Sequence, residues 1–182
     1  MLLSLNTNEA PDIAKVGGKA ASLIRLQQAG ANVPAGIVLT SDYFAAWLDR
    51  VEASDAWREA LSILVGAGGR QPDLATRTRL ADTCDEAKRL AAGFALSEEQ
   101  RALLATVDDF GPGPCAVRSS SPEEDLAGAS FAGQYETVLN VDTADVEEAI
   151  RTCFASCLDS RVLLYKQEMK FERLTPTIAV VV

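Results

Sequence analysis

The stretch CAVRSSSPEED, residues 115–125, and its continuation LAGASFAGQYET, residues 126–137, predict more of the fold and function than any other part of the sequence. A short apolar run delivers Arg118, serines follow, and a segment of small residues contains Gly128 and Gly133. Proteins hold anions with a fixed cation, hydroxyl donors and closely approaching backbone amides. The stretch therefore predicts phosphate binding, although an Arg-Ser-Ser-Ser turn is also ordinary loop construction.

Two blocks of sequence resemble the ATP-binding domain at the N-terminus of phosphoenolpyruvate synthase, pyruvate phosphate dikinase and the rifampicin phosphotransferases. The first block consists of AVRSS at 116–120, EDL at 124–126, ASFAGQ at 129–134 and ETVLNV at 136–141. The second consists of VGGKAASL at 16–23 and VPAGIVLT at 33–40. The resemblance covers essentially the whole chain, although residues 50–110 match only in helical character. It implies an α/β (α+β) fold, the N-terminal lobe of an ATP-grasp-like domain, with a mixed sheet and a helical insert.

The resemblance also implies which residues contact ATP. Matching position by position gives phosphate contacts to Lys19, Arg118, Gly133 and Thr137, and a catalytic role to Arg118. Further candidates for a phosphate-binding loop are Gly17, Gly18, Ser119, Ser130 and Gln134. Arg118 suits its role because a guanidinium offers a permanently charged fork to phosphate oxygens.

The residues around Lys19 allow two interpretations when they are considered alone. Two glycines and a lysine at the start of a helix predict a cation beside free backbone amides, at the positive end of the helix dipole. The spacing is not that of a Walker A motif, so an ordinary helix start with a solvated lysine is the alternative.

Composition limits the class of protein. The 182 residues carry a net charge of -9, with 26 acidic and 17 basic residues and no basic cluster, which argues against nucleic-acid binding. Neither a signal peptide nor a membrane-spanning stretch is evident, so a cytoplasmic protein is expected. The absence of histidine excludes a histidine base or a phosphohistidine within these residues. The cysteine spacing predicts buried thiols rather than a zinc site.

Apolar periodicity predicts the secondary structure. Helices are expected over residues 19–28, 41–51, 57–65, 73–92, 97–107, 143–157 and from 160, and strands over 33–39, 115–118, 135–141 and 177–182. The strand at 33–39 contains Pro34 and Gly36, which suits an edge or a bend. We expect 1–65 and 111–182 to form the nucleotide-binding lobe, with 73–107 as a helical segment.

Several side chains are expected to cap helices. Ser97 and Gln100 form a capping box, and Thr143 and Ser160 precede apolar helical stripes. Ser121 with Pro122 resembles a helix start, so the acidic residues that follow are expected to cap that helix rather than to bind metal; these are Glu123, Glu124 and Asp125.

The apolar strand at 177–182 reaches the last residue of the sequence, where an exposed edge would invite aggregation. We therefore expect a truncated domain. The resemblance implies that the magnesium ligands lie outside this chain, as do the second ATP-grasp lobe, a phosphohistidine domain and an acceptor-binding domain.

The expected parent activity is ATP-dependent phosphoryl transfer to pyruvate through the phosphohistidine carrier, with this piece inactive or nearly so by itself. A rifamycin phosphotransferase and a stand-alone nucleotide-binding or regulatory module are the alternatives.

Overall fold

The computed structural model describes residues 2–69, 71–105, 113–123, 135–171 and 174–182. Within them, five strands form one sheet in the order β1-β2-β5-β3-β4. The strands are β1 (Leu2–Ser4), β2 (Ile37–Leu39), β3 (Cys115–Ser120), β4 (Thr137–Val141) and β5 (Ala179–Val181). Each pairing between these strands is antiparallel, so the prediction of a mixed sheet is wrong, and the fold is α+β.

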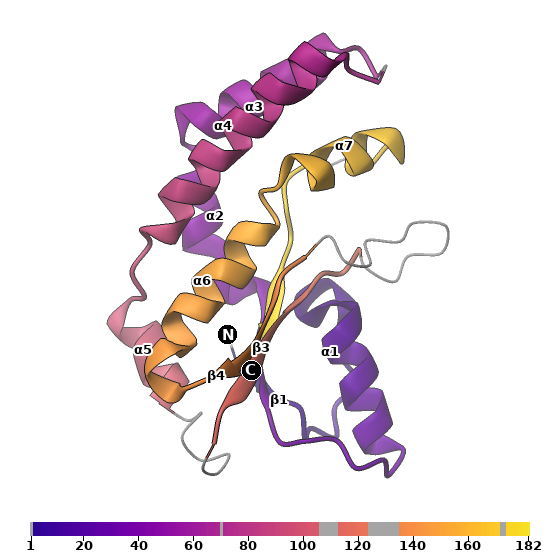
Figure 1. The fold of residues 1–182 in the computed structure, drawn as a ribbon. Helices are drawn as coiled ribbons and strands as arrows, with labels where there is room; N and C mark the ends of the chain where they lie inside the picture. The colour runs from indigo at the N-terminus through magenta and orange to yellow at the C-terminus, as the bar shows by residue number, and fades with distance from the viewer. Residues whose placement is uncertain (1, 70, 106–112, 124–134, 172–173) are drawn as a thin grey trace.

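Helices cover both faces of the sheet (Figure 1). They are α1 (Ile13–Gln28), α2 (Ala45–Glu52), α3 (Asp55–Gly66), α4 (Leu74–Ala92), α5 (Glu98–Leu104), α6 (Val146–Ser156) and α7 (Ser160–Glu168). Short 3-10 turns at Ser41–Phe44 and Thr143–Asp145 lead into α2 and α6. Helix α1 lies on one face and α6 on the other, whereas α3 and α4 form a long hairpin that projects away from the sheet.

Strand alternation separates two apolar cores. Val38 and Val181 pack with Ile24 of α1, whereas Leu39 and Val180 belong to the larger core on the α6 side. Successive side chains point to opposite faces of a strand, so the apolar run in β5 supplies both cores. Its burial on both faces explains why this strand contains no polar residue.

The positions of β2 and β5 in the sheet differ from two of the predictions. Strand β2 lies between β1 and β5, not at an edge, and Pro34 and Gly36 precede its first residue, Ile37. Strand β5 lies between β2 and β3, where Val180 pairs with both Leu39 and Ser119. The edge that was expected at residues 177–182 is therefore covered on both sides.

Aromatic side chains join the helices on the α6 side. The Phe44 ring stacks on the Phe154 ring with a centroid separation of 5.3 Å, and Trp47 meets Phe154 edge-on at 5.1 Å. Trp47 and Trp57 are buried, and both belong to this core. Such pairs stabilise a core beyond their buried area, by about 0.5–1.5 kcal/mol each.

Most predicted helix boundaries were confirmed, but α1 begins at Ile13, not at residue 19, and only one of the predicted caps was found. Ser97 and Gln100 form the expected capping box of α5. Thr143 makes no capping bond, and Ser160 is the first residue of α7, whose cap is Asp159. The helix expected to bury its face at 97–107 has Leu103 and Leu104 only half-buried, and Val107 lies outside the described residues.

None of the helices in the described part combines the length and apolar character needed to cross a bilayer.

Candidate functional site

Helix α1 is attached directly to the end of β3 around the kink at Gly17. Ser120 Oγ donates to the Val16 carbonyl at 2.8 Å and accepts from the Ala20 amide at 3.0 Å. The Gly18 amide donates to the Ser121 carbonyl at 2.9 Å. We call these contacts the α1–β3 junction. It brings together the two blocks of sequence, 16–23 and 116–120, that are far apart in the chain.

Gly17 makes this close approach possible. Its φ of 76° interrupts the helix, and a Cβ added there would overlap the backbone and hydroxyl of Ser120. Glycine adopts positive φ without a steric penalty and has no Cβ to collide. Gly17 therefore has a structural reason to be glycine that is independent of any ligand.

Serine groups accept hydrogen bonds from the backbone amides near the kink in α1. Because the amides of Gly18 and Ala20 are bonded to Ser121 and Ser120, the prediction of free amides at this point is wrong for both residues. The geometry gives Gly17 and Gly18 a part in holding α1 on the sheet.

Lys19 contacts β3 at the residue that follows Arg118. Lys19 Nζ donates to the carbonyl of Ser119 at 3.0 Å, and Ser119 follows Arg118 in β3. The Lys19 side chain is half-buried, so its position is restricted by the surrounding atoms. Two cationic residues from distant parts of the sequence thus come to the same end of the strand.

Arg118 and Thr137 occupy directly opposite positions on β3 and β4. Opposite residues of an antiparallel pair point to the same face, with Cβ atoms about 4.5–5.5 Å apart. Both are exposed, and by strand alternation they share the face of Ser120, on which α1 lies. The structure therefore gathers Lys19, Arg118 and Thr137 on one side of the sheet.

The remaining predicted residues are placed differently. Ser119 is buried, and its hydroxyl donates to the Glu136 carbonyl at 2.8 Å, so it points away from the face of Arg118. Gly133, Ser130 and Gln134 lie outside the described residues, as do Glu124 and Asp125.

Sequence reasoning missed the part played by Glu123. It lies in a turn, not in a capped helix, and its Oε1 is 2.7 Å from the Nζ of Lys166. The capping prediction is therefore wrong for Glu123. A signal was present, because Lys166 follows Val162 by four positions in the buried stripe of α7.

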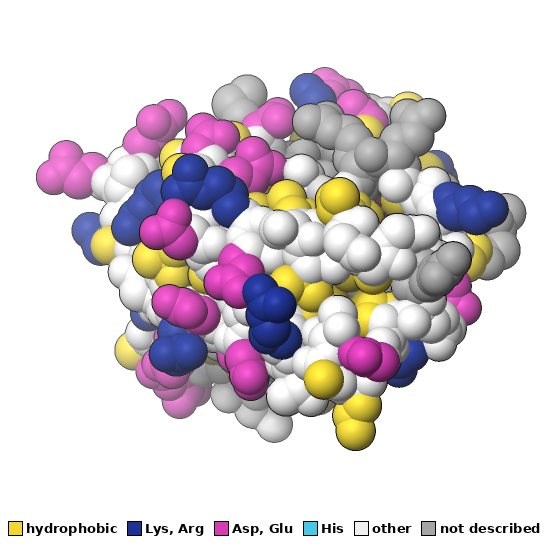
Figure 2. All heavy atoms as spheres, turned by 90° about the horizontal axis from the view of Figure 1, so that it is seen from above, with side chains coloured by type: hydrophobic (Ala, Val, Ile, Leu, Met, Phe, Trp, Pro, Cys, Tyr) yellow, Lys and Arg dark blue, Asp and Glu magenta, His cyan; other side chains and the backbone are white. Residues whose placement is uncertain are grey.

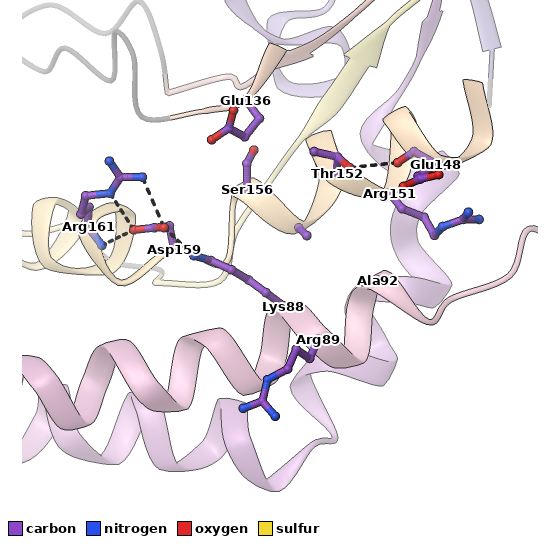
Figure 3. Close-up of a pocket in the computed structure, with 11 residues that line it drawn as sticks. Lys88, Arg89, Ala92, Glu136, Glu148, Arg151, Thr152, Ser156, Asp159 and Arg161 are labelled. Atoms are coloured by element: carbon purple, nitrogen blue, oxygen red, sulfur yellow. Dashed lines mark hydrogen bonds and ion pairs between the residues drawn. The ribbon is translucent and has the colours of Figure 1, made fainter. Parts of the chain in front are cut away.

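A hollow of about 530 Å³ lies on the other side of the sheet, between α4, α6 and the start of α7 (Figure 3). Basic residues from each helix line it, but so do Glu136, Glu148 and Asp159. Mixed charge of this kind does not favour one class of ligand.

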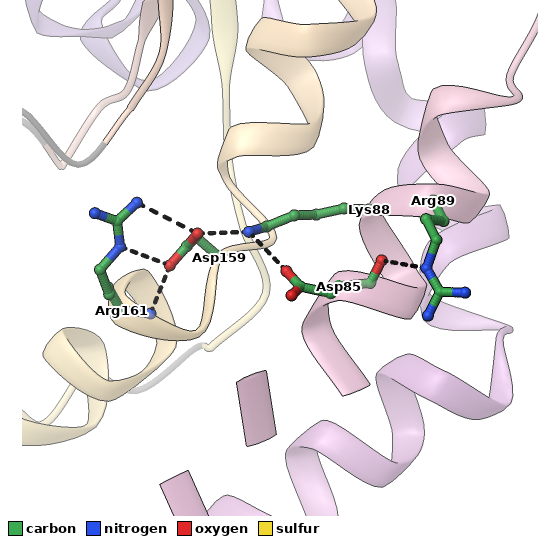
Figure 4. Close-up of polar contacts among 5 residues, drawn as sticks. All are labelled: Asp85, Lys88, Arg89, Asp159 and Arg161. Atoms are coloured by element: carbon green, nitrogen blue, oxygen red, sulfur yellow. Dashed lines mark hydrogen bonds and ion pairs between the residues drawn. The ribbon is translucent and has the colours of Figure 1, made fainter. Parts of the chain in front are cut away.

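Asp159 organises the charges beside this hollow (Figure 4). Its carboxylate lies 2.5 Å from Lys88 Nζ and 2.9 Å from Arg161 Nε, and Lys88 also reaches Asp85 at 3.2 Å. Burial alone would raise the pKa of Asp159, but hydrogen bonds from Arg161 and Lys88 hold the pKa at about 2. We call these four residues the Asp159 cluster. Its cations already have carboxylate partners.

The three buried cysteines are unsuited to act as nucleophiles. All four are free thiols, and three are buried. Burial raises the pKa of Cys153 to about 11, and that of Cys84 and Cys157 to about 12. These three thiols stay protonated at neutral pH, so they lack the thiolate that attack or metal binding requires.

Acidic and basic side chains intermingle on the face seen in Figure 2. Magenta carboxylates flank the blue side chains, so no continuous basic field forms there. Across the described residues, no group of three or more Cys, Asp or Glu side chains is arranged to hold a metal ion.

Comparison with known proteins matches residues 13–182 to the family model for the pyruvate phosphate dikinase AMP/ATP-binding domain. The chain is 32% identical to a probable phosphoenolpyruvate synthase of Methanothermobacter thermautotrophicus over 179 residues, which cover 94% of the chain and 25% of the relative. It is 34% identical to the phosphoenolpyruvate synthase of Aquifex aeolicus over 200 residues, 99% of the chain and 22% of the relative.

An uncharacterized phosphotransferase, YvkC of Bacillus subtilis, is 31% identical over 167 residues, 91% of the chain and 17% of the relative. The chain thus spans a quarter or less of the length of these curated relatives. Because the family model covers nearly the whole sequence, the chain belongs to the pyruvate phosphate dikinase AMP/ATP-binding domain family.

Proposed function

We propose that this chain binds the phosphate groups of ATP on the face of the sheet that carries Lys19, Arg118 and Thr137. The observation that carries the proposal is the hydrogen bond from Lys19 Nζ to the Ser119 carbonyl. It attaches the Lys19 cation to β3 at the residue after Arg118. Membership of an ATP-binding domain family supports the choice of ligand.

Each residue has a distinct part in this proposal. Arg118 is exposed, and its guanidinium fork can bind two phosphate oxygens at once. Lys19 contributes a second positive charge, and Thr137 a hydroxyl donor. Opposite charges 4 Å apart attract by about 4 kcal/mol at an effective dielectric constant near 20. The two cations would thus offset much of the repulsion between phosphate groups.

Arg118 is also the proposed catalytic residue. Phosphoryl transfer is accelerated mainly by positioning and by stabilising the charge on the transferred group, and a guanidinium does both. Gly133, Ser130 and Gln134 remain candidates for the same phosphate site, with Gly17, Gly18 and Ser119 as its support.

Magnesium ligands are not assigned among the described residues, where no group of three or more Cys, Asp or Glu side chains is arranged to hold a metal ion. On the family resemblance alone we propose that residues outside this chain hold the ion, and we assign no step to it here.

For the protein as a whole we propose phosphoryl transfer from ATP, through a phosphohistidine domain, to pyruvate. The named phosphoenolpyruvate synthases among the relatives support pyruvate as acceptor. One relative of similar identity is an uncharacterized phosphotransferase. The alternative proposal is therefore another acceptor, such as a rifamycin. The second lobe and the acceptor-binding domain would come from outside the 182 residues.

The test is calorimetric titration of the chain with ATP, with and without magnesium. We expect saturable binding that falls at least tenfold in Arg118→Ala, because the paired phosphate contacts are charge-assisted. Arg58→Ala is the matched control, since Arg58 is an exposed arginine on α3 whose ion pair is with Asp55. Equal affinity in Arg118→Ala and Arg58→Ala, or no binding by the folded chain, would refute the proposal.

A further inference from the structure

The interior contains an ion pair that the proposed function does not use. Lys166 of α7 has no exposed surface. Its Nζ lies 2.7 Å from Glu123 Oε1 and donates to the Thr175 carbonyl at 2.9 Å, with the Phe171 ring 6.0 Å away. Lysine is almost never fully buried unless it is paired. The contact is therefore a specific one, built from two segments 43 positions apart in the chain.

This pair is poorly suited to stabilising the fold. Glu123 Oε2 is buried and has no hydrogen-bond partner among the described residues, so within that part of the chain half of the carboxylate is unsatisfied. Burial raises the pKa of Glu123, and Lys166 opposes that shift without cancelling it. Replacing a buried ion pair by apolar residues of similar size is often neutral or stabilising. Stability alone does not explain why these two residues are charged.

The contacts around Glu123 lead to the α1–β3 junction. The Glu123 amide donates to Ser121 Oγ at 3.2 Å, and Ser121 Oγ donates to the Thr177 carbonyl at 3.3 Å. The Ser121 carbonyl in turn accepts from Gly18. The pair thus sits where the end of β3, the start of α1 and the approach to β5 meet.

Those three segments position the proposed phosphate-binding cations. Lys19 follows Gly18 in the sequence, and Arg118 pairs with Val181 of β5. Lys166 donates to the carbonyl of Thr175, in the segment that leads into β5. It also forms the ion pair with Glu123, in the turn that follows β3. Both points are therefore bonded to the segments that carry Lys19 and Arg118.

We propose that Lys166 and Glu123 are positioning residues for phosphate binding, which fix the end of β3 against β5 and α1 so that Lys19 and Arg118 keep their spacing. The inference rests on the proposed function, because it concerns the same phosphate site. It adds two residues that touch no ligand and act through the backbone of Ser121 and Thr175.

The test uses the double variant Glu123→Leu/Lys166→Met of the 182-residue chain, with ATP as the titrated ligand. We expect a midpoint of unfolding at or above that of the unmutated chain, together with about tenfold weaker ATP binding. The matched control is Glu147→Leu/Arg151→Met, which removes an ion pair of the same 2.7 Å length within α6, together with the longer 3.7 Å contact of Glu147 with Arg101 of α5. ATP affinity should not change in the control.

A second pair of variants keeps the test decisive if the apolar variant fails to fold. Glu123→Gln/Lys166→Gln retains hydrogen-bonding groups without charge, and Lys166→Arg retains the cation and should keep ATP affinity within about twofold. A folded double variant with unchanged ATP affinity overturns the positioning role and leaves the proposed function intact. Absence of binding by the unmutated chain overturns both.

Discussion

The α1–β3 junction and the Asp159 cluster both join segments that are distant in the sequence, but by different forces. The junction uses a glycine, serine hydroxyls and backbone groups that are buried. The cluster uses charged side chains, of which those of Arg161 and Asp85 are 64% and 63% exposed and those of Lys88 and Asp159 are 27% and 15% exposed. Close packing fixes positions to within fractions of an ångström, whereas exposed ion pairs adapt and are weakened by salt. The difference indicates that the proposed phosphate face depends on a rigid junction and the hollow behind it on adjustable charges.

The largest effect should come from Gly17→Ala in the junction. The added Cβ would overlap Ser120, and the φ of 76° is unfavourable for alanine, so we expect a loss of at least about 3 kcal/mol in the free energy of unfolding. Urea denaturation measures it. The matched control is Gly68→Ala, because Gly68 also has a positive φ, of 60°, but no atom within 4 Å of an added Cβ. Gly68→Ala should lower the free energy of unfolding by about 1 kcal/mol. Equal losses in Gly17→Ala and Gly68→Ala would show that packing at the junction is not tight.

A smaller effect is expected from Ser120→Ala, which removes the hydroxyl and leaves the fold's backbone in place. The Val16 carbonyl and the Ala20 amide would lose their partner in a buried site, at a cost of about 1–3 kcal/mol. Thr78→Ala on the exposed face of α4 removes one hydroxyl bond to Leu74 and should change stability by less than about 0.5 kcal/mol. Thermal unfolding of both variants compares the two sites.

The smallest expected effect is a loss of stability at low pH when Asp159 in the Asp159 cluster becomes protonated. The pKa of Asp159 in the fold, about 2, lies below its ordinary value of 3.8, so its stabilising contribution is complete above about pH 4 and is lost as the pH falls through 2. Solvent screening reduces that contribution to about 1 kcal/mol. Urea unfolding between pH 2 and 7 should show the loss in the unmutated chain but not in Asp159→Asn. A loss of the same size in both would assign the acid sensitivity to other groups.

Local features of the fold were predictable because short-range patterns determine them. Apolar periodicity located the helices, and the capping box at Ser97 was confirmed because both of its bonds lie within one turn. The family was also identified correctly, since the blocks at 16–23 and 116–120 carry enough matching residues.

Features that depend on distant partners were not predictable in the same way. The interior position of β5 follows from pairing with β2 and β3, and one strand's sequence does not reveal its neighbours. Lys166 interrupts an apolar stripe, but the sequence does not identify its carboxylate partner. That partner, Glu123, is known only from the packing of α7 beside the turn that contains it. The two adjacent glycines lie inside α1, and the sequence did not show that the helix begins before them or that Gly17 is the one with positive φ.

The central position of β5 also has a consequence for the order in which the molecule folds. β1 pairs with β2, and β3 pairs with β4, but the two pairs are joined through β5, whose residue Val180 lies about 140 positions after Leu39. Contacts between residues so far apart slow folding, because the entropy of closing the intervening chain is lost before the contact forms. Insertion of β5 should therefore be a late, rate-limiting event, and until it occurs the chain holds two small, incomplete sheets.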